Sequence, residues 1–386
     1  MLSRPRTILA IAVGLILLAP GCGQPTTVRE ASGVARQGDY LLIVDDEQNG
    51  VYFRHRLEPE ERGPLIRIEP RQLEPVALPL SNLATDLESI DVLADGRVAV
   101  ISERLRSLFG PDGVIAEYDA PYAEFGKRGL EGVAVLALPR QVSRVAALWE
   151  GGYPEFDFVP RQLRERVGRI ALRPLLLVHD LAPGLREIAI RAGKDVELET
   201  PLPTGEEPSA QRFRAPDLVW HRAPDGNWGF IVILSSLNSM GERAYLHHWL
   251  QRFSAGGKRI GEPLDIDKFA PAELKGANWE GLAWFEDGNS LILVHESTPQ
   301  DASAVTAIVL PLPEDWKFSR ADLPLVTESE ADYFLESPRQ PRADGTVPAG
   351  TKVTLMRNEG SYYFVRTEAA LEAYVLASNL APFRAP

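Results

Sequence analysis

The stretch NWEGLAWFEDGNSLILVHES, residues 278–297, indicates the fold class of this chain. It predicts a β-hairpin, with a short strand EGLAWF, a turn at EDGN, and a second strand SLILVHE that is rich in aliphatic residues. Glu280 begins the first strand and Glu296 ends the second. In an antiparallel pair such residues are neighbours, with Cβ atoms about 5 Å apart. The hairpin is therefore predicted to carry two carboxylates at its open end.

Three further segments repeat this arrangement. They are DLESIDVLADGRVAVISE (86–103), GLEGVAVLALPRQVSRVAALWE (129–150) and PDLVWHRAPDGNWGFIVILSS (216–236). Each has an acidic residue entering a short strand, then a turn and a strongly apolar strand. The leading acids of the four units, Glu88, Glu131, Asp217 and Glu280, are separated by 43, 86 and 63 residues. Periods near 40–60 residues with three or four strands each are typical of propeller blades.

The rest of the chain supports an all-β fold. Short apolar runs alternate with turn clusters such as ADG and PDG, and long helical periodicity is scarce. The segment DYLLIVDDEQNGVYFRHRL (39–57) resembles the second and third strands of another unit, whose first strand is expected from beyond residue 312. We therefore expect a five- or six-bladed β-propeller over residues 38–325, followed by a small barrel.

The repeated acids predict a metal site at one mouth of the propeller channel, because the first two strands of a blade lie nearest the axis. The predicted ligands are Glu88, Glu103, Glu131, Glu150, Asp217, Glu280 and Glu296. Like charges this close raise one another's pKa unless a cation neutralises them. Oxygen ligands without Cys suit Ca²⁺ or Mg²⁺ better than Zn²⁺. The alternative is that these acids are ordinary solvated residues at strand ends.

The E-G-[small]-A entries and the later strands ending in S-E or H-E resemble the "esterase-like activity of phytase" group of secreted β-propellers, to which calcium-dependent phytases are related. The resemblance covers about residues 39–312, and the third unit departs from it at Asp217 and Ser235. It implies a propeller with metal-binding acids at the channel mouth that hydrolyses phosphoesters or carboxylesters. Arg104 and His295 are expected beside the acids, where they could pair with them or contact a substrate, and they are the residues predicted to assist catalysis. A non-catalytic binding or scaffold protein of the cell envelope is the alternative.

The N-terminus has the three-part plan of an export signal. Arg4 and Arg6 precede an apolar run from Ile8 to Ala19, which is too short for a spanning helix. Cys22 is the only cysteine, and small residues ending in Cys resemble the lipobox of bacterial lipoproteins. We expect a signal peptide over residues 1–21, lipid attachment at Cys22 as the membrane anchor, and a flexible tether over residues 22–37. The protein would then face the periplasm or sit on the outer membrane of a Gram-negative cell. The alternative is an ordinary signal peptide cut nearby.

The C-terminal region, residues 328–386, changes character. The string AGTKVTLMRNEGSYYFVRT, followed by EAYVLASNL, resembles bacterial SH3-like domains. This resemblance implies binding of a cell-wall peptide or another protein, and Tyr362, Tyr363 and Tyr374 are candidates to line such a groove or to fill the core. The alternative is a module that only packs on the propeller.

Charge and motifs exclude several function classes. The formal net charge of −13 disfavours nucleic acid as a partner, since such proteins need basic patches. The sequence contains no G-x-S-x-G, no P-loop and no H-E-x-x-H motif. A nucleophile-elbow hydrolase, a nucleotide-binding ATPase and a zinc protease are therefore disfavoured.

Overall fold

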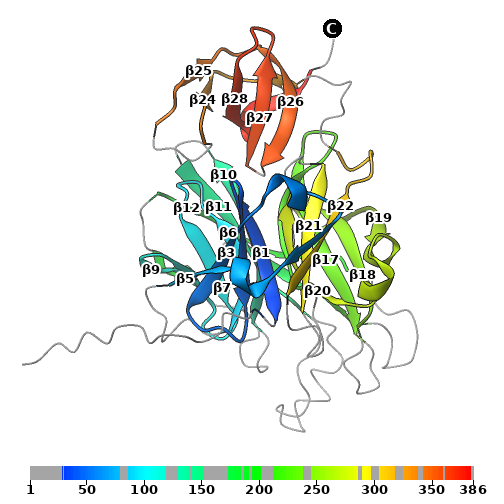
Figure 1. Cartoon of the computed structure of the whole chain (residues 1–386). Helices are drawn as coiled ribbons and strands as arrows, with labels where there is room; N and C mark the ends of the chain where they lie inside the picture. The colour runs from blue at the N-terminus through cyan, green and yellow to red at the C-terminus, as the bar shows by residue number, and fades with distance from the viewer. Residues whose placement is uncertain are drawn as a thin grey trace, which may run out of the picture.

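The computed structural model describes residues 28, 30–78, 86–118, 129–138, 141–151, 173–183, 187–190, 194–200, 212–237, 245–285, 289–296, 304–317, 325–337, 342–359 and 361–383. Within these residues the chain forms five sheets of four or five strands around a common axis, and a seven-stranded sheet near the C-terminus. This is a five-bladed β-propeller carrying a smaller C-terminal sheet at one end of its axis (Figure 1). The all-β prediction is confirmed, and the predicted range of five or six blades resolves to five.

Each blade is a meander of strands that starts near the axis. Blade 1 consists of β1 (Ala31–Gln37), β2 (Tyr40–Asp45), β3 (Val51–Arg56) and β5 (Glu74–Ala77). Blade 2 consists of β6 (Leu87–Val92), β7 (Val98–Ser102), β8 (Ser107–Gly110), β9 (Gly113–Tyr118) and the parallel strand β13 (Glu187–Ile190). Blade 3 consists of β10 (Leu130–Leu138), β11 (Val142–Trp149), β12 (Leu175–Leu181) and β14 (Lys194–Glu197).

The last two blades complete the ring. Blade 4 consists of β15 (Arg212–Arg214), β16 (Leu218–Arg222), β17 (Trp228–Leu237), β18 (Tyr245–Ser254) and β19 (Arg259–Asp265). Blade 5 consists of β20 (Asn278–Trp284), β21 (Ser290–Glu296), β22 (Val305–Pro311) and β4 (Leu65–Ile68). Short 3₁₀ turns cover Pro59–Glu61, Pro70–Gln72, Ile266–Lys268 and Ala272–Leu274. The hairpin predicted at 278–297 is β20 and β21.

The ring closes differently from the expectation. The first strand of blade 1 does not come from beyond residue 312, because β1 pairs with β2 directly. Instead, β4 of the N-terminal region pairs with β22 as the outer strand of blade 5. The N-terminal region thus supplies strands to both the first and the last blade, and this removes the free sheet edges between the two ends of the propeller.

The tether prediction is wrong for its last seven residues. Ala31–Gln37 forms β1, the innermost strand of blade 1, and packs beside β6 and β20. Its Ala-Ser-Gly-Val-Ala sequence lacks the large apolar residues that usually mark a strand. Small side chains are needed here because neighbouring backbones approach closely at the axis.

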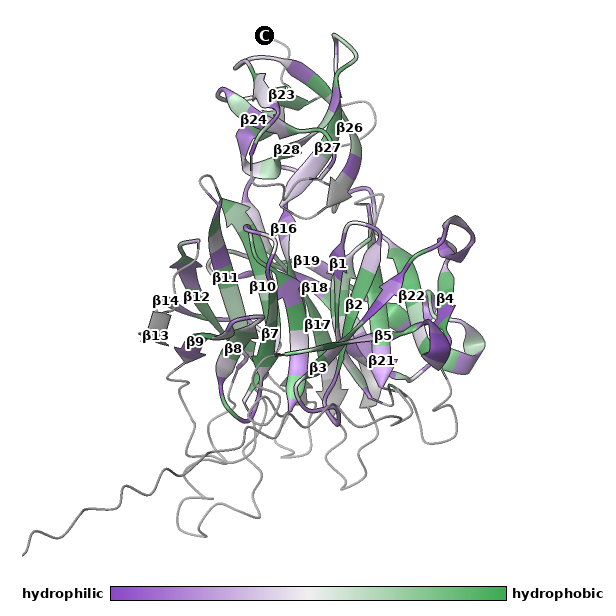
Figure 2. Cartoon of the chain, turned by 60° about the vertical axis from the view of Figure 1, so that its left-hand side comes forward, coloured by the Kyte–Doolittle hydropathy of each residue, from purple (hydrophilic) through white to green (hydrophobic). Residues whose placement is uncertain are grey.

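Hydrophobic cores lie between successive blades. Blades 2 and 3 share a core containing Leu108, Val133 and Trp149, while blades 5 and 1 share one containing Phe53 and Ile292. Since each blade is covered on both faces, its inner strands are apolar on both faces. Figure 2 shows this for β10 and β11, whose ribbons are largely green, and eight of the nine residues of β10 are buried.

The C-terminal sheet contains β23 (Leu325–Thr327), β24 (Ala331–Phe334), β25 (Gly345–Val347), β26 (Lys352–Glu359), β27 (Tyr362–Thr367), β28 (Glu372–Leu376) and β29 (Leu380–Pro382), with a 3₁₀ turn at Ala377–Asn379. Tyr363 lies in the hydrophobic core of this sheet. Tyr362 and Tyr374 instead pack with Ala94 and Ala137 of the propeller. Two of the three tyrosines expected to line a groove or fill the core therefore contribute to the contact with the propeller.

The predicted signal peptide and Cys22 lie outside the described residues. In the part of the chain that is described, no helix has the length and apolar character needed to cross a membrane.

Candidate metal-binding site

Three of the predicted ligands sit at β-bulges in the innermost strands. The register shifts between Leu87 and Ser89, between Leu130 and Gly132, and between Trp279 and Gly281. The residues inside these shifts are Glu88, Glu131 and Glu280. Blade 1 has the same shift between Ala31 and Gly33, around Ser32. A bulge re-aims a side chain out of the regular pleat, so the repeated bulge presents one side chain from each of blades 1, 2, 3 and 5 at the same level of the axis.

The second strands supply the other carboxylates. The pairing of blades 2 and 3 ends at Ser102 and Trp149, and Glu103 and Glu150 follow directly. In blade 5 the last pair joins Glu296 to Asn278. In blade 1 Asp45 pairs with Ala31, which makes Asp46 the equivalent residue. We name Asp46, Glu88, Glu103, Glu131, Glu150, Glu280 and Glu296 the acidic ring. It lies at the end of the propeller away from the C-terminal sheet, because Ala137 at the far end of β10 contacts Ser361 of that sheet.

Asp46 was missed by the sequence analysis. The available signal was the pair Asp45-Asp46 at the end of an apolar strand, DYLLIVDD, which matches the strand endings of the other units. Blade 1 carries Ser32 instead of an acid at its bulge, so its hairpin lacked the paired carboxylates that identified the others. Glu30 also joins this region, since it forms an isolated bridge with Glu296.

The acids approach closely enough to share a cation. Carboxylate oxygens of Asp86, Glu88 and Glu103 lie within 4.8 Å of one another, and so do those of Glu103, Glu131 and Glu150. Glu103 belongs to both groups and also accepts a hydrogen bond of 2.7 Å from the amide of Gly129. The shared residue makes the two groups one continuous cluster across blades 2 and 3.

Burial and mutual repulsion shift the pKa values of these groups. Burial is the largest cause raising the pKa of Glu88 well above its usual value, and the charges of Glu103, Asp46 and Glu280 raise it further. The pKa of Glu131 is raised in the same way by burial and by Glu150 and Glu88. Burial, with Glu30 and Asp45, raises the pKa of Asp46 to about 8. Burial and mutual repulsion therefore favour the protonated or cation-bound forms of Asp46, Glu88 and Glu131 over the free carboxylates.

One part of the acidic ring is compensated by the protein itself. Arg214 of β15 donates to Glu280, lies 3.5 Å from Glu150, and donates to the side-chain oxygen of Asn278 at 3.2 Å. The amide of Asn278 donates to Glu280 and, at 2.6 Å, to Glu296. Burial raises the pKa of Glu280 to about 6, while Arg214 opposes that rise. Arg214 and Asn278 carried no recognisable signal in the sequence.

Asp217 occupies a different level of the axis and is not part of the acidic ring. Its carboxylate accepts hydrogen bonds from the Ser89 hydroxyl at 3.0 Å and from the Leu282 amide at 2.7 Å. The Ser89 hydroxyl in turn accepts from the Val133 amide at 3.1 Å. Asp217 therefore connects the innermost strands of four blades, which is a structural task distinct from its predicted place among the metal ligands.

The two predicted catalytic side chains are placed differently from each other. His295 is buried on β21, its Nδ1 lies 2.7 Å from the carbonyl oxygen of Glu296, and its ring lies edge-on to Trp279. Arg104 is exposed in the turn between β7 and β8. Among the described contacts, none joins Arg104 to a carboxylate of the acidic ring.

A closely packed layer lies immediately inside the acidic ring. A Cβ atom on Gly33 would come within 2.6 Å of the Ser89 Cα, and one on Gly281 within 2.9 Å of the Gly33 Cα. A Cβ on Gly132 would lie 3.1 Å from the Cα of Asp217. Backbones of neighbouring blades thus touch at the axis, and we call Gly33, Ser89, Gly132, Asp217 and Gly281 the axial layer.

Comparison with known proteins assigns no family to this chain. Neither a protein family nor a curated protein matches this sequence. Among solved structures, virginiamycin B lyase from Staphylococcus aureus is 11% identical with a TM-score of 0.33, covering 73% of this chain and 95% of that one. A gluconolactonase from Xanthomonas campestris is 12% identical, with a TM-score of 0.32 and coverage of 75% and 87%. The calcium-binding protein regucalcin from Agrobacterium tumefaciens is 11% identical, with a TM-score of 0.34 and coverage of 77% and 96%. Similarities this weak do not transfer an activity to this chain.

Proposed function

We propose that the acidic ring binds a divalent cation, with Ca²⁺ as the preferred ion. The observation that carries this proposal is the presence of two clusters of three acidic residues that share Glu103. Within each cluster, carboxylate oxygens of the three residues lie within 4.8 Å of one another. Ca²⁺ takes six to eight oxygen ligands in flexible geometry, and a set of carboxylates without Cys or a coordinating His cluster fits that preference. Binding would replace protons on Glu88 and Glu131 by a cation and relieve their repulsion.

The same site supports metal-assisted hydrolysis of phosphoesters or carboxylesters. A bound cation would polarise the ester oxygen and lower the pKa of a water molecule. Glu88, Glu103, Glu131 and Glu150 would hold the ion, and Arg214 would fix the position of Glu150. The residues proposed to assist are His295, buried beside Glu296, and Arg104, exposed at the turn after Glu103. The likeness of the hairpin motifs to esterase-like and phytase-like propellers supports this class of reaction.

We further propose that the protein is exported and anchored by a lipid on Cys22, with the C-terminal sheet as an SH3-like module for a cell-wall peptide or protein. The export-signal pattern of residues 1–21 and the single cysteine support the first part. The motif AGTKVTLMRNEGSYYFVRT supports the second. Mass spectrometry of the membrane-bound protein tests the anchor, because acylation of Cys22 would add a defined mass to the N-terminal peptide.

A non-catalytic scaffold of the cell envelope is the second candidate. Arg214 favours it, because a protein cation already compensates Glu150 and Glu280. In that case the ring would hold a structural ion, and its role would be to keep the ends of blades 2 and 3 together.

Calorimetric titration of the metal-stripped protein with Ca²⁺ tests the site. Stoichiometric binding is expected, and it should be lost in a Glu88→Gln, Glu131→Gln double variant while a Glu74→Gln variant binds normally. Glu74 is a suitable control because it is exposed and paired with Arg54 on blade 1. Repeating the titration in two buffers of different ionisation enthalpy should show proton release.

The outcomes separate the candidates. No Ca²⁺ binding by the unmutated protein removes the metal site and the metal-assisted hydrolase together. Ca²⁺ binding without turnover of phosphoester and carboxylester substrates would favour the non-catalytic scaffold. Turnover that disappears on chelation and in the double variant establishes the hydrolase.

A further inference from the structure

The N-terminal region leaves blade 1 to complete blade 5 and then returns. After β3, strand β4 pairs with β22 as the outer strand of blade 5, and β5 then pairs with β3 in blade 1. Figure 2 shows β4 beside β22. Two 3₁₀ turns, Pro59–Glu61 and Pro70–Gln72, lie on either side of β4. We call residues 57–73 the closing segment, because they complete the ring of blades.

The two turns are joined to each other and to His55 near the end of β3. His55 Nε2 lies 2.9 Å from Oε2 of Glu61, and its Nδ1 lies 3.3 Å from the backbone carbonyl oxygen of Gln72. The side-chain amide of Gln72 donates to Oε1 of Glu61 at 3.1 Å. We call His55, Glu61 and Gln72 the clasp. It is a closed triangle of contacts that holds the two ends of the closing segment together.

Both ring nitrogens of His55 face acceptors. An ionised carboxylate only accepts hydrogen bonds, and so does a backbone carbonyl group. A neutral imidazole has one N–H donor, so it can satisfy one of the two oxygens and turns a lone pair toward the other. The imidazolium donates to both. Because only 3% of the surface of His55 is exposed, solvent has little access to the ring. The geometry of the clasp therefore matches the protonated ring.

The other charges on the elements packed around the clasp are paired or exposed. Arg54 lies on the opposite face of β3 and pairs with Glu74 of β5 at 2.7 Å. Asp39, next to β2, lies 3.6 Å from Arg62. Glu61 is therefore the charged group that faces the imidazole ring. The remaining charged residues of β3, of β4 and of the two turns with their flanks are exposed: Arg56, Glu58, Glu60, Arg67, Glu69 and Arg71.

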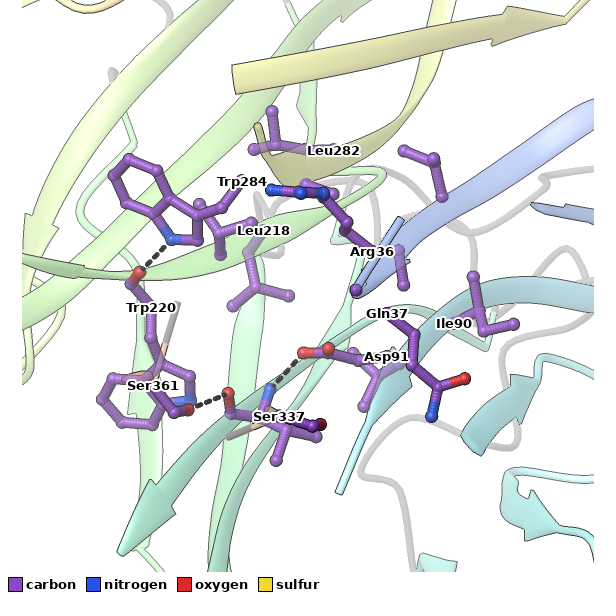
Figure 3. A pocket seen from close by; sticks show the side chains of 17 residues that line it. Arg36, Gln37, Ile90, Asp91, Leu218, Trp220, Leu282, Trp284, Ser337 and Ser361 are labelled. Carbon is purple, nitrogen blue, oxygen red and sulfur yellow. Dashed lines mark hydrogen bonds between the residues drawn. The ribbon is translucent and has the colours of Figure 1, made fainter. Parts of the chain in front are cut away.

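A pocket on the propeller axis shows how the fold fixes side chains without a titrating group (Figure 3). There the indole N–H of Trp284 donates to the carbonyl oxygen of Trp220 at 2.9 Å. The indole N–H of Trp220 donates to the carbonyl oxygen of Ala134 at 3.2 Å. An indole is a donor only, whereas histidine changes its charge between pH 5 and 8. The clasp therefore responds to pH in a range where the indole contacts do not.

We propose that the clasp is a pH-sensitive switch on the closure of the propeller, which holds β4 on blade 5 while His55 is protonated. Loss of the proton removes one of the two donors and the charge that attracts Glu61. Because protonation and closure favour each other, the clasp is tightest at the acidic end of the range in which histidine titrates and weakens as the pH rises. Release of β4 would expose the edge of β22 and open the ring. This switch does not depend on the proposed metal site, because none of its three residues belongs to the acidic ring.

NMR and amide exchange on the metal-free full chain at pH 5.5 and pH 8.5 test the proposal. The ¹⁵N shifts of the His55 ring should show two protonated nitrogens at pH 5.5 and a neutral ring at pH 8.5. Exchange protection of Leu65–Ile68 and Val305–Ile308, corrected for the intrinsic rate at each pH, should fall about tenfold between the two conditions. The fall is measured relative to β10 and β11, so that a change in global stability cancels. These measurements need no variant to fold.

Variants assign the effect to the clasp. His55→Gln puts an amide that does not titrate in place of the ring, so the relative protection of β4 and β22 should become independent of pH. Glu61→Gln should lower that protection at pH 5.5. Glu74→Gln breaks an exposed ion pair on the same blade and should keep the normal pH dependence. A His55 ring that is neutral at pH 5.5 overturns the proposal. Equal pH dependence in His55→Gln and the unmutated protein, or a loss of protection shared by all blades, overturns it as well.

Discussion

Arg214 donates a hydrogen bond to the carboxylate of Glu280 inside a ring that is otherwise built from acids. The arginine comes from β15, a short strand of blade 4, while Glu280 comes from the bulge of blade 5. Both side chains are largely buried, with 10% and 12% of their surfaces exposed. The protein thus carries its own counter-charge within the acidic ring. Glu150 lies 3.5 Å from Arg214 and also belongs to the carboxylates clustered around Glu103, so it links the compensated part of the ring to that cluster.

Replacing Arg214 should destabilise the protein strongly in the absence of divalent cations. Arg214→Gln leaves Glu150 and Glu280 buried without their cation, and breaking a buried ion pair in this way costs about 3–5 kcal/mol. The loss should be smaller at pH 5 than at pH 7, because Glu280, whose pKa is about 6, no longer needs the guanidinium once it is protonated. Urea denaturation in a chelating buffer at both pH values measures the difference.

The matched control for Arg214 is Arg366→Gln. Arg366 pairs with Glu372 on the exposed surface of the C-terminal sheet, where such a pair contributes about 0–1 kcal/mol. Equal losses of stability in the two variants, or a pH-independent loss for Arg214→Gln, would show that the Arg214 contacts do not compensate the ring.

The metal-free protein should become less stable as the pH rises from about 4 to about 8. The pKa of Asp46 is raised from 3.8 to about 8 and that of Glu280 from 4.5 to about 6, in both cases chiefly by burial. Between the ordinary and the raised pKa the folded state holds more protons than the unfolded state. Unfolding free energy therefore decreases with pH across this window, and the decrease is complete above the raised pKa. Thermal melts at half-unit pH intervals in a chelating buffer measure this slope.

Asp46→Asn should flatten the upper part of that pH dependence, from about pH 6 to pH 8, and raise the Tm at pH 8. Asp332→Asn, on the C-terminal sheet, should leave the slope unchanged. If the proposed metal site is correct, saturating Ca²⁺ should raise the Tm more at pH 8 than at pH 5, because protons compete with the ion. A Tm that rises with pH in the metal-free protein would contradict the raised pKa values.

The sequence predicted three of the four acidic blade ends because those hairpins pair local residues. Glu131 and Glu150, for example, belong to one continuous hairpin, so their proximity follows from antiparallel pairing alone. Asp46 was not predicted as part of the acidic ring because its partner strand has Ser32 at the position where the other hairpins have Glu. Arg214 was not predicted for another reason. Both β15 and β16 pair with β17, and this division of the innermost strand places an arginine at the axis, which no hairpin pattern in the sequence indicates.

The closure of the ring was also beyond prediction from local pattern. The pairing of β4 with β22 joins residues more than 230 positions apart, and neither strand carries a signal for the other. Likewise, β1 begins with the small residues Ala31, Ser32 and Gly33, which are favourable only because three backbones meet at the axis. Such strands are determined by the contacts of the finished propeller and not by their own propensity.

The axial layer should tolerate no side chain at Gly281. A Cβ atom there would lie 2.6 Å from the Val294 Cγ2 and 2.9 Å from the Cα of Gly33, so β1 or β20 would have to move. Gly281→Ala should lower the unfolding free energy by about 1–3 kcal/mol or more. Gly63→Ala is the matched control, because the nearest atom to its new Cβ, the Leu65 carbonyl oxygen, is 4.0 Å away. Chemical denaturation of both variants tests the layer, and a neutral Gly281→Ala would show that the blades are looser at the axis.

Arg222 should control how firmly the C-terminal sheet sits on the propeller. Its guanidinium donates to the carbonyl oxygens of Ala377, at 2.6 Å, and Leu380, and it lies 5.7 Å from the centre of the Trp228 ring. Arg222→Met keeps much of the apolar contact but leaves two buried carbonyl groups without these donors, at about 1–3 kcal/mol each. Amide exchange should then accelerate across β27 and β28 while β10 and β11 remain protected. Arg366→Met, which removes an exposed arginine from β27 itself, should change neither set. Equal acceleration in both sheets would mean that Arg222 stabilises the whole protein, whereas unchanged exchange would mean that Tyr362 and Tyr374 hold the C-terminal sheet without it.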